Sequence, residues 1–316
     1  MAGELIRFDD KHISVEQMQM SVDRILQCYI RNIAGPPSLL IKDYLREAGF
    51  WHVAMIGRGC KLDPKLISAL IERWRLETHT FHLSCGEYTI TLEDVHLQLG
   101  LLVNGDAVTR SVHSADWGVV CYELLGAIPD NVNGGRIEMG WLRDTFPEPD
   151  DDSTELEKIR YARAYILQII KGYLMPDLSR NLVHLRWLLK LVDFRAAGEF
   201  SWRSAVLATL YPEMCGATRP NKAKIGDIRL LLEQRSKAQF QWTSYEDPAI
   251  RVVIPDEYLQ NLNAWHVKVL LVNFAIVEMH QSDRVLRQLG FRQPIPVAPE
   301  VLDDHHKINL RQLHTD

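Results

Sequence analysis

The chain has the length and composition of a globular protein. It contains 316 residues, of which 47% are hydrophobic and 24% charged, and its formal net charge is −5. These values exclude the disordered, collagen-like and coiled-coil classes. Apolar runs stay shorter than the roughly 18 residues of a membrane span, and the first residues lack the basic and then apolar order of a secretory signal. We therefore expect a soluble protein that stays inside the cell.

The first part of the chain predicts three helices. The first lies in a helical extension over residues 1–37 and starts at a capping-box pattern. After a pair of prolines, Ser38 can cap a second helix that runs through Glu47. The third begins at the cap Asp63, which is followed by proline at the first helical position, and should stop before Thr78.

One stretch departs from helical periodicity. Over residues 78–91, two short runs rich in β-branched and aromatic residues enclose a turn that contains Gly86. Thr91 and Asp94 then form a capping-box pattern, and Gly100 stands where a left-handed helix terminator belongs. The sequence predicts a short β-hairpin that leads directly into a helix.

The rest of the chain again favours helices. Residues 104–152 form a looser segment, with an exposed acidic loop over residues 144–153 and, later, a linker over residues 243–256. Helices are predicted over residues 154–173, 182–192, 201–211, 226–240, 262–280 and 282–290. The fold class is therefore mainly α: a multi-helix globular domain over residues 38–316 with one short β-hairpin.

Positive charge is concentrated in the middle of the chain. Residues 158–237 carry 15 lysines and arginines against 6 aspartates and glutamates. The basic residues of its densest stretch, residues 219–237, include Lys222, Lys224, Arg229 and Arg235. Such a stretch can neutralise phosphates of a nucleic acid, or it can form a solvated helix face. We favour the helix face and keep nucleic-acid contact by these four residues as the alternative.

The sequence lacks the usual catalytic and metal-binding motifs. It has no phosphate-binding loop, no H-E-x-x-H, no G-x-S-x-G and no C-x-x-C pattern. His79, His82 and Cys85 come nearest to a set of zinc ligands. On an extended strand, however, positions 79 and 82 point to opposite faces. We therefore expect structural roles for these histidines and no metal site.

A second polar cluster lies near the end of the chain. It contains Glu278, His280, Asp283 and Arg284, and a carboxylate beside an imidazole is a pairing typical of general-base catalysis. The same side chains can cap a short helix at a helix junction and form an ion pair with Arg287. We favour these structural roles and predict no catalytic residue and no cofactor.

The run from Glu77 to Val95, ETHTFHLSCGEYTITLEDV, closely resembles the signature of the plant mobile domain, a family that is also labelled aminotransferase-like. Further agreement comes from the segment that begins Ser201-Trp202 and from residues 277–288, and the resemblance covers residues 40–316. The matching signature residues are Thr78, His79, Phe81, His82, Gly86, Glu87, Thr89, Thr91, Asp94, Gly100, Trp202, Glu278, His280, Asp283, Arg284, Arg287 and Gln288.

The resemblance implies particular cellular roles but no particular chemical reaction. The family comprises transposon-derived proteins of the nucleus that support meristem maintenance, genome stability and transposon silencing, in some cases with a long-form serine/threonine phosphatase homologue as partner. It supplies no catalytic residues, and the sequence shows no Schiff-base lysine with the partners that pyridoxal phosphate needs. At Arg203 the chain departs from the family, which usually has glycine there.

Three hypotheses for function follow. The first is a non-catalytic, all-α nuclear module that acts by protein–protein interaction, without a membrane or a small-molecule substrate. The second is an accessory domain of a mobile element that binds nucleic acid through the basic segment 219–237. The third is an enzyme, which predicts a cluster of side chains with shifted pKa values around His79 or His280.

Overall fold

The structure is a computed structural model, and it describes residues 36–56, 64–101, 105–109, 116–176, 179, 181–218, 268–274, 276–288, 292–295 and 297–299. Its elements begin with η1 (Leu39–Ile41), α2 (Lys42–Glu47), α3 (Trp51–Ile56), α4 (Pro64–Ile71), β1 (Trp74–Arg75), β2 (Thr80–Leu83), β3 (Gly86–Tyr88), α5 (Leu92–Leu99), α6 (Trp117–Leu125), β4 (Arg136–Glu138) and α7 (Met139–Thr145). They continue with α8 (Glu155–Ile169), η2 (Ile170–Leu174), β5 (Leu182–His184), η3 (Leu185–Leu191), α9 (Phe194–Gly198), α10 (Trp202–Ala217), β6 (Lys268–Asn273), β7 (Ile276–Gln281) and η8 (Ser282–Val285). The described part of the chain is mainly α, as the sequence predicts.

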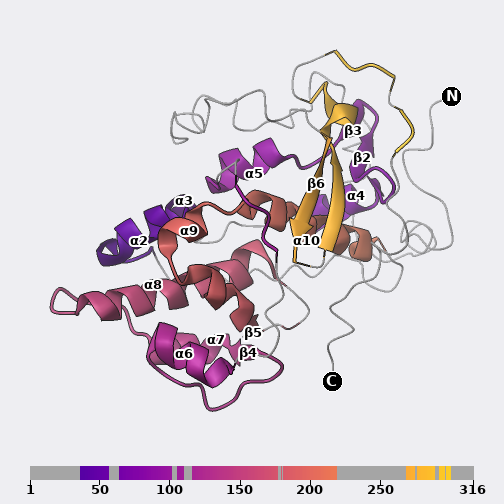
Figure 1. The fold of residues 1–316 in the computed structure, drawn as a ribbon. Helices are drawn as coiled ribbons and strands as arrows, with labels where there is room; N and C mark the ends of the chain where they lie inside the picture. The colour runs from indigo at the N-terminus through magenta and orange to yellow at the C-terminus, as the bar shows by residue number, and fades with distance from the viewer. Residues whose placement is uncertain are drawn as a thin grey trace.

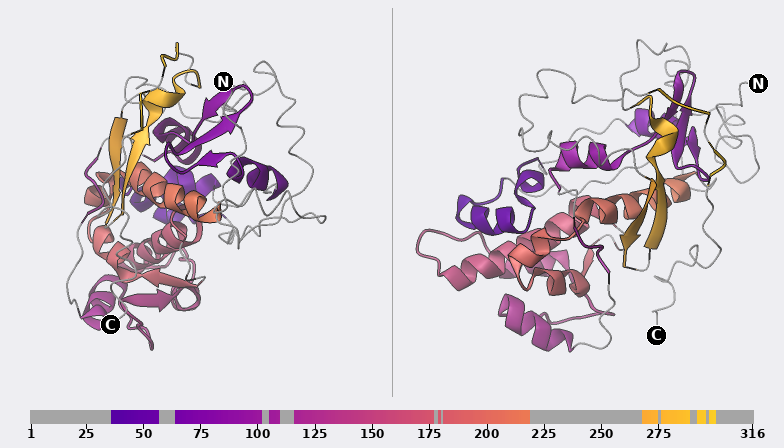
Figure 2. Two further views of the ribbon diagram at one scale, coloured as in Figure 1. Left: turned by 90° about the vertical axis from the view of Figure 1, so that its right-hand side faces the viewer. Right: turned by 45° about the horizontal axis from the view of Figure 1, so that its top comes forward.

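Two long helices organise the packing. α8 contacts η1, α2, α6, α7 and η3, whereas α10 contacts α5 and the strands β1, β6 and β7 (Figures 1 and 2). An aromatic cluster lies at the start of α10, where the Trp202 ring is 5.0 Å from Phe50 and 5.9 Å from Trp187. Burial of such large rings is a major source of stability.

Two helix starts predicted from the sequence, at Thr91 and Thr154, are confirmed. The Thr91 side chain accepts a hydrogen bond from the Asp94 amide, and the Asp94 carboxylate accepts one from the Thr91 amide, which completes a capping box at α5. Thr154 and Glu157 form the same reciprocal pair at α8. α5 ends at Gly100, whose φ of 64° is the left-handed conformation that glycine adopts without strain.

The predicted hairpin is present and belongs to a three-stranded antiparallel sheet. β2 pairs with β3 so that Phe81 lies opposite Tyr88, and β1 pairs with the other edge of β2 so that Trp74 lies opposite Phe81. The sequence predicted an extended strand at His79, and this prediction is wrong. His79 occupies the turn between β1 and β2 with a φ of 51°, and the alternation of strand faces therefore does not apply to it.

The helix predicted over residues 262–280 is wrong in its described part. β6 and β7 instead form an antiparallel hairpin, from Lys268 opposite Gln281 to Asn273 opposite Ile276. A short apolar run has no period that separates a buried helix from a buried strand. Here the β-branched residues of the run favour the strand, and α10 covers the hairpin.

Residues 104–152 contain more regular structure than the predicted loose segment. In the described part, α6 and α7 are helices and β4 pairs with β5. Leu182–His184 is therefore a strand, whereas the predicted helix at this place begins only with the 3-10 helix η3. Residues 150–152 carry exposed carboxylates in the connection between α7 and α8.

Several sequence predictions lie outside the described residues. They concern most of the helical extension over residues 1–37, the helix over residues 226–240, the linker over residues 243–256 and the four basic residues Lys222, Lys224, Arg229 and Arg235. The helix that starts after Ser201 is confirmed, and it runs past its predicted end to Ala217 with Pro212 inside it.

Candidate functional site

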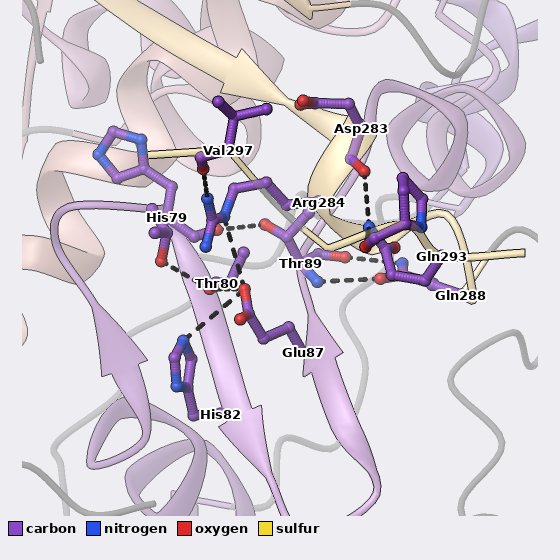
Figure 3. Close-up of polar contacts among 12 residues, drawn as sticks. His79, Thr80, His82, Glu87, Thr89, Asp283, Arg284, Gln288, Gln293 and Val297 are labelled. Atoms are coloured by element: carbon purple, nitrogen blue, oxygen red, sulfur yellow. Dashed lines mark hydrogen bonds and ion pairs between the residues drawn. The ribbon is translucent and has the colours of Figure 1, made fainter. Parts of the chain in front are cut away.

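Most of the signature residues gather where two distant parts of the chain meet. One part is the hairpin β2–β3 with the turns beside it, and the other, here called the strap, is the described chain between residues 276 and 299. The strap comprises β7, η8 and the segment after them, and it lies beside the hairpin (Figures 1 and 3). Contacts such as the one between His79 and Met279 join positions 200 residues apart.

His79 faces the strap from the turn between β1 and β2. Its Nδ1 lies 3.4 Å from the carbonyl oxygen of Met279, and its Nε2 lies 3.6 Å from Oε2 of Glu278. The imidazole also stacks on the Tyr211 ring of α10, with centroids 4.8 Å apart. Burial lowers the pKa of His79 and raises the pKa of Glu278 to about 7, because each loses the hydration of its charged form.

His280 is fully buried next to Tyr211. The Tyr211 hydroxyl donates a hydrogen bond to the carbonyl oxygen of Ile90 over 2.7 Å, and it lies 2.9 Å from Nδ1 of His280. Nε2 of His280 has no hydrogen-bond partner among the described residues. Burial is the largest of the causes that lower the pKa of His280 to about 3, and nearby His79 and Arg203 contribute to the same shift. Burial also raises the pKa of Tyr211.

Arg203, the residue that departs from the family pattern, is buried near this cluster. Only 1% of its surface is exposed, and it donates a hydrogen bond to the carbonyl oxygen of Leu92 over 3.2 Å. Its Nε has no acceptor among the described residues. Burial lowers the pKa of this guanidinium to about 9, since the cation loses its hydration there.

Gln288 joins the strap to the hairpin through main-chain contacts. Its Oε1 accepts from the amide of Thr89 over 2.9 Å, and its Nε2 donates to the carbonyl oxygen of Thr89 over 2.7 Å. The same Nε2 lies 3.3 Å from the capping carboxylate of Asp94. The side-chain amide therefore pairs with the chain as a neighbouring strand would (Figure 3).

A charged network surrounds Glu87 on β3. Its Oε2 accepts from the Thr80 hydroxyl over 3.3 Å and lies 3.6 Å from Nε of Arg284 and 3.8 Å from Nε2 of His82. Arg284 also donates to the carbonyl oxygen of Val297 over 2.6 Å, as Figure 3 shows. Asp283 and Gln293 lie beside it, and the Gln293 amide donates to the Asp283 carbonyl oxygen.

The structure corrects the predicted role of the second polar cluster. Glu278 and His280 lie on strand β7 and not at a helix junction, so they contact the hairpin side and α10 and cap no helix. Asp283 and Arg284 do lie in the short 3-10 helix η8. The signature residues Gly100 and Trp202 lie apart from the strap, at the end of α5 and in the core.

Sequence reasoning missed three residues of the site. Tyr211, Trp74 and Ile90 contribute the ring and carbonyl groups around His79 and His280. Their contacts span many positions along the chain, and no local pattern marks them. The two histidines are nevertheless brought together, and their shifted pKa values fit the cluster that the enzyme hypothesis predicts. Within the described residues, no group of three or more histidine, cysteine or acidic side chains is placed to hold a metal.

Comparison with known proteins identifies the family. The model of the plant mobile domain matches residues 49–227 and 217–315. The chain belongs to the plant mobile domain family. This confirms the resemblance carried by the hairpin signature, and no solved structure matches the chain.

Relatives of this plant mobile domain occur in Arabidopsis thaliana. It is 34% identical to Protein MAIN-LIKE 1 over 79% of the chain, and 29% identical to Protein MAINTENANCE OF MERISTEMS over 95% of the chain. It is 32% identical to the Serine/threonine-protein phosphatase 7 long form homolog over 83% of the chain. The matches span 58%, 73% and 24% of the lengths of these relatives, respectively. None of the described helices is long and apolar enough to cross a membrane.

Proposed function

We propose that this plant mobile domain is a non-catalytic module that acts in the nucleus by binding protein partners, in meristem maintenance, genome stability and transposon silencing. The observation that carries the proposal is the use of the signature side chains. Gln288, Arg284 and His79 contact other parts of the same chain and thereby hold the strap on the hairpin. These contacts within the chain support a structural task for the residues that carry the resemblance to the family.

The enclosure of the histidines supports a role without catalysis. A general base must come within hydrogen-bond distance of its substrate. His280 has no exposed surface, and its Nδ1 faces Tyr211. His79 is only 14% exposed, and its ring nitrogens face Met279 and Glu278 of the strap. Burial is the largest cause of each shifted pKa in this cluster.

The nuclear compartment and the identity of the partner belong to the same proposal. Two relatives carry names that refer to meristems or to a meristem protein, and one carries the name of a long-form phosphatase homologue. We propose that such a phosphatase homologue is a partner of this chain. Direct binding between the two purified proteins tests this pairing without the complications of an extract.

The experiment for the module itself is co-purification from plant nuclei. The tagged full chain should recover, at mild salt, a protein that also binds the purified chain directly. The matched variant is His280→Asn, which removes the imidazole at a fully buried position, and it should recover the same partner. Failure of the wild-type chain to recover any direct binder, or an enzymatic activity that only His280→Asn abolishes, would contradict the proposal.

A second candidate function is nucleic-acid binding, and the basic segment 219–237 favours it. Neutralising Lys222, Lys224, Arg229 and Arg235 together should abolish binding to DNA or RNA and the steep salt dependence that phosphate contacts produce. The control neutralises Arg46, Arg143, Lys158 and Arg195, which lie outside the segment. Equal loss of binding in both variants would indicate general charge attraction and not a site.

A further inference from the structure

We propose that the domain presents the proline-rich end of its strap as a docking peptide for a partner whose aromatic-lined groove binds polyproline II helices. This end, here called the proline segment, comprises the described residues 293–295 and 297–299, and its sequence from Gln293 to Pro299 is QPIPVAP. The inference rests on the proposed function, because it names the place at which a protein partner would bind and the kind of partner that fits.

The composition of the proline segment favours a polyproline II conformation. Three of the seven residues from Gln293 to Pro299 are prolines. Proline fixes φ at about −65° and restricts the residue before it to extended conformations. The described residues of the segment accordingly belong to no helix, strand or turn. A polyproline II helix has three residues per turn and no internal hydrogen bonds, so it can exist without a partner strand.

The exposure of the side chains follows the same period of three. Gln293 and Pro299, which lie two polyproline II turns apart, are half-buried. The other described positions of the segment are exposed, namely Pro294, Ile295, Val297 and Ala298. One edge of a three-sided helix therefore faces the domain, and the other two edges face outwards. An alternating strand does not fit this pattern, because it would place the half-buried Gln293 and the exposed Ile295 on the same face.

The apolar side chains of the proline segment stand out by their exposure. Ile295 is 94% exposed and Val297 is 79% exposed, and no other large apolar side chain of the described residues reaches these values. Contact with an apolar partner surface would remove this area from water, which is favourable. A three-sided helix that lies in a groove offers two of its edges to the groove. Here Ile295 lies on one outward edge and Val297 on the other.

Two polar contacts hold the proline segment on the domain and leave these apolar side chains exposed. Nη1 of Arg284 donates to the carbonyl oxygen of Val297 over 2.6 Å, and Nε2 of Gln293 donates to the carbonyl oxygen of Asp283 over 3.0 Å (Figure 3). Arg284 also lies 3.6 Å from the carboxylate of Glu87 on β3, so the segment is connected to the hairpin. Because the segment is ordered before it binds, the entropic cost of binding is lower.

Strand pairing with a partner is disfavoured along both edges of the segment. Pro294 and Pro296 have no N–H, and an extended chain would direct both residues to one edge. On the other edge, the carbonyl oxygen of Val297 already accepts a hydrogen bond from Arg284. A groove of aromatic rings needs neither edge, because it binds the prolines and apolar side chains of a polyproline II helix. Arg292, exposed directly before the segment, adds a positive charge that an acidic side chain beside the groove would complement.

Binding of the full chain to purified SH3, WW and EVH1 domains, measured by isothermal titration calorimetry, tests the proposal. At least one of these domains, whose grooves are lined by aromatic side chains, should bind with a dissociation constant below about 1 mM. Ile295→Asp should weaken that binding by about tenfold or more, because it places a charge where an apolar side chain enters the groove. The control Ile128→Asp changes another exposed apolar side chain and should bind like the wild-type chain.

A matched pair of variants at Ala298 distinguishes groove binding from strand pairing. Ala298→Pro restricts the segment to polyproline II and removes one more N–H, whereas Ala298→Gly makes the segment more flexible. The groove should bind Ala298→Pro at least as tightly as the wild-type chain. It should bind Ala298→Gly about two- to fivefold more weakly, since a flexible segment loses more entropy on binding. A partner that pairs with the segment as a strand would reverse the order of the two variants.

The contrary outcomes are equally specific. No binding to any of the three domains, equal weakening by Ile295→Asp and Ile128→Asp, or the reverse order of the Ala298 variants would overturn the proposal. Self-association of the wild-type chain that Ile295→Asp abolishes would overturn it too, because a second copy would then occupy the segment. Equal recovery of a nuclear partner by the wild-type chain and by Ile295→Asp would overturn this inference and leave the proposed function intact. Failure to recover any partner would contradict the proposed function, and the purified domains would still decide the role of the segment.

Discussion

At the residue scale, two arginines, the half-buried Arg163 and the buried Arg203, show how differently a guanidinium can be accommodated. The guanidinium of Arg163 donates hydrogen bonds to three main-chain carbonyl oxygens at 2.8–2.9 Å. That of Arg203 donates to one carbonyl oxygen, and its Nε has no acceptor in the described part of the chain. Burial without such partners is costly, because the cation loses its hydration without compensation. The buried Arg203 side chain is therefore expected to lower the stability of the fold.

This contrast predicts opposite effects of the same substitution. Arg203→Met should raise the free energy of unfolding by about 1–3 kcal/mol, because a packed apolar side chain replaces an uncompensated buried charge. Arg163→Met should lower it by about 1–3 kcal/mol, since carbonyl groups lose their donors. Urea denaturation of both variants measures the difference. Destabilisation by Arg203→Met comparable to that of Arg163→Met would show that the Arg203 cation is well solvated after all.

At the scale of elements, one capping motif occurs in two environments. Thr91 and Asp94 start α5 within the buried region beside the strap, and the Asp94 carboxylate also lies near Gln288. Thr154 and Glu157 start α8 at an exposed position. The two boxes have the same pattern of hydrogen bonds. A difference in stability between variants that lack one box or the other therefore reports the effect of the surroundings.

Thr91→Ala should therefore cost more stability than Thr154→Ala. Loss of the exposed cap should lower the free energy of unfolding by about 1 kcal/mol, because water can replace the lost hydrogen bond. Loss of the buried cap should cost about 2–3 kcal/mol, since it leaves the Asp94 amide without its acceptor in a site that excludes water. Thermal and chemical denaturation of the two variants provide the comparison. Equal costs would indicate that the site beside the strap is open to solvent.

At the scale of the whole molecule, close approach of helices constrains single glycines. A Cβ atom on Gly198 in α9 would lie 2.2 Å from the carbonyl oxygen of Glu47 in α2. This distance is far below contact, so the two helices pack against each other only because the side chain is absent. Gly216 in α10 has open space around the equivalent position.

Alanine should consequently act in opposite directions at these two glycines. Gly198→Ala should lower the free energy of unfolding by about 2–4 kcal/mol, because α9 must move away from α2 and the buried side chains between them lose contact. Gly216→Ala should raise it by about 0.5–1 kcal/mol through the higher helix propensity of alanine. Differential scanning calorimetry resolves both changes. A neutral Gly198→Ala would show that the α2–α9 contact adjusts freely.

Local chemistry in the sequence determined the mainly α class, the hairpin over residues 78–91 and the helix starts at Thr91 and Thr154. Capping boxes, turn glycines and β-branched runs act over a few residues, so they can be read without a partner. Gln288, Asp94 and the histidines could be named from the sequence as well, because the resemblance to the family is carried by short runs of residues. Their contacts were not predictable, because each depends on a group far away along the chain.

Only the tertiary structure decided that β6 and β7 pair as a hairpin and that the strap lies beside β2 and β3. An apolar run satisfies a buried helix and a buried strand equally well until its neighbours are known, and here α10 supplies them. The shifted pKa values of Glu278 and His280 were decided at the same level. A side chain's pKa follows from the water it loses on burial, and burial is a property of the assembled molecule and not of any local segment.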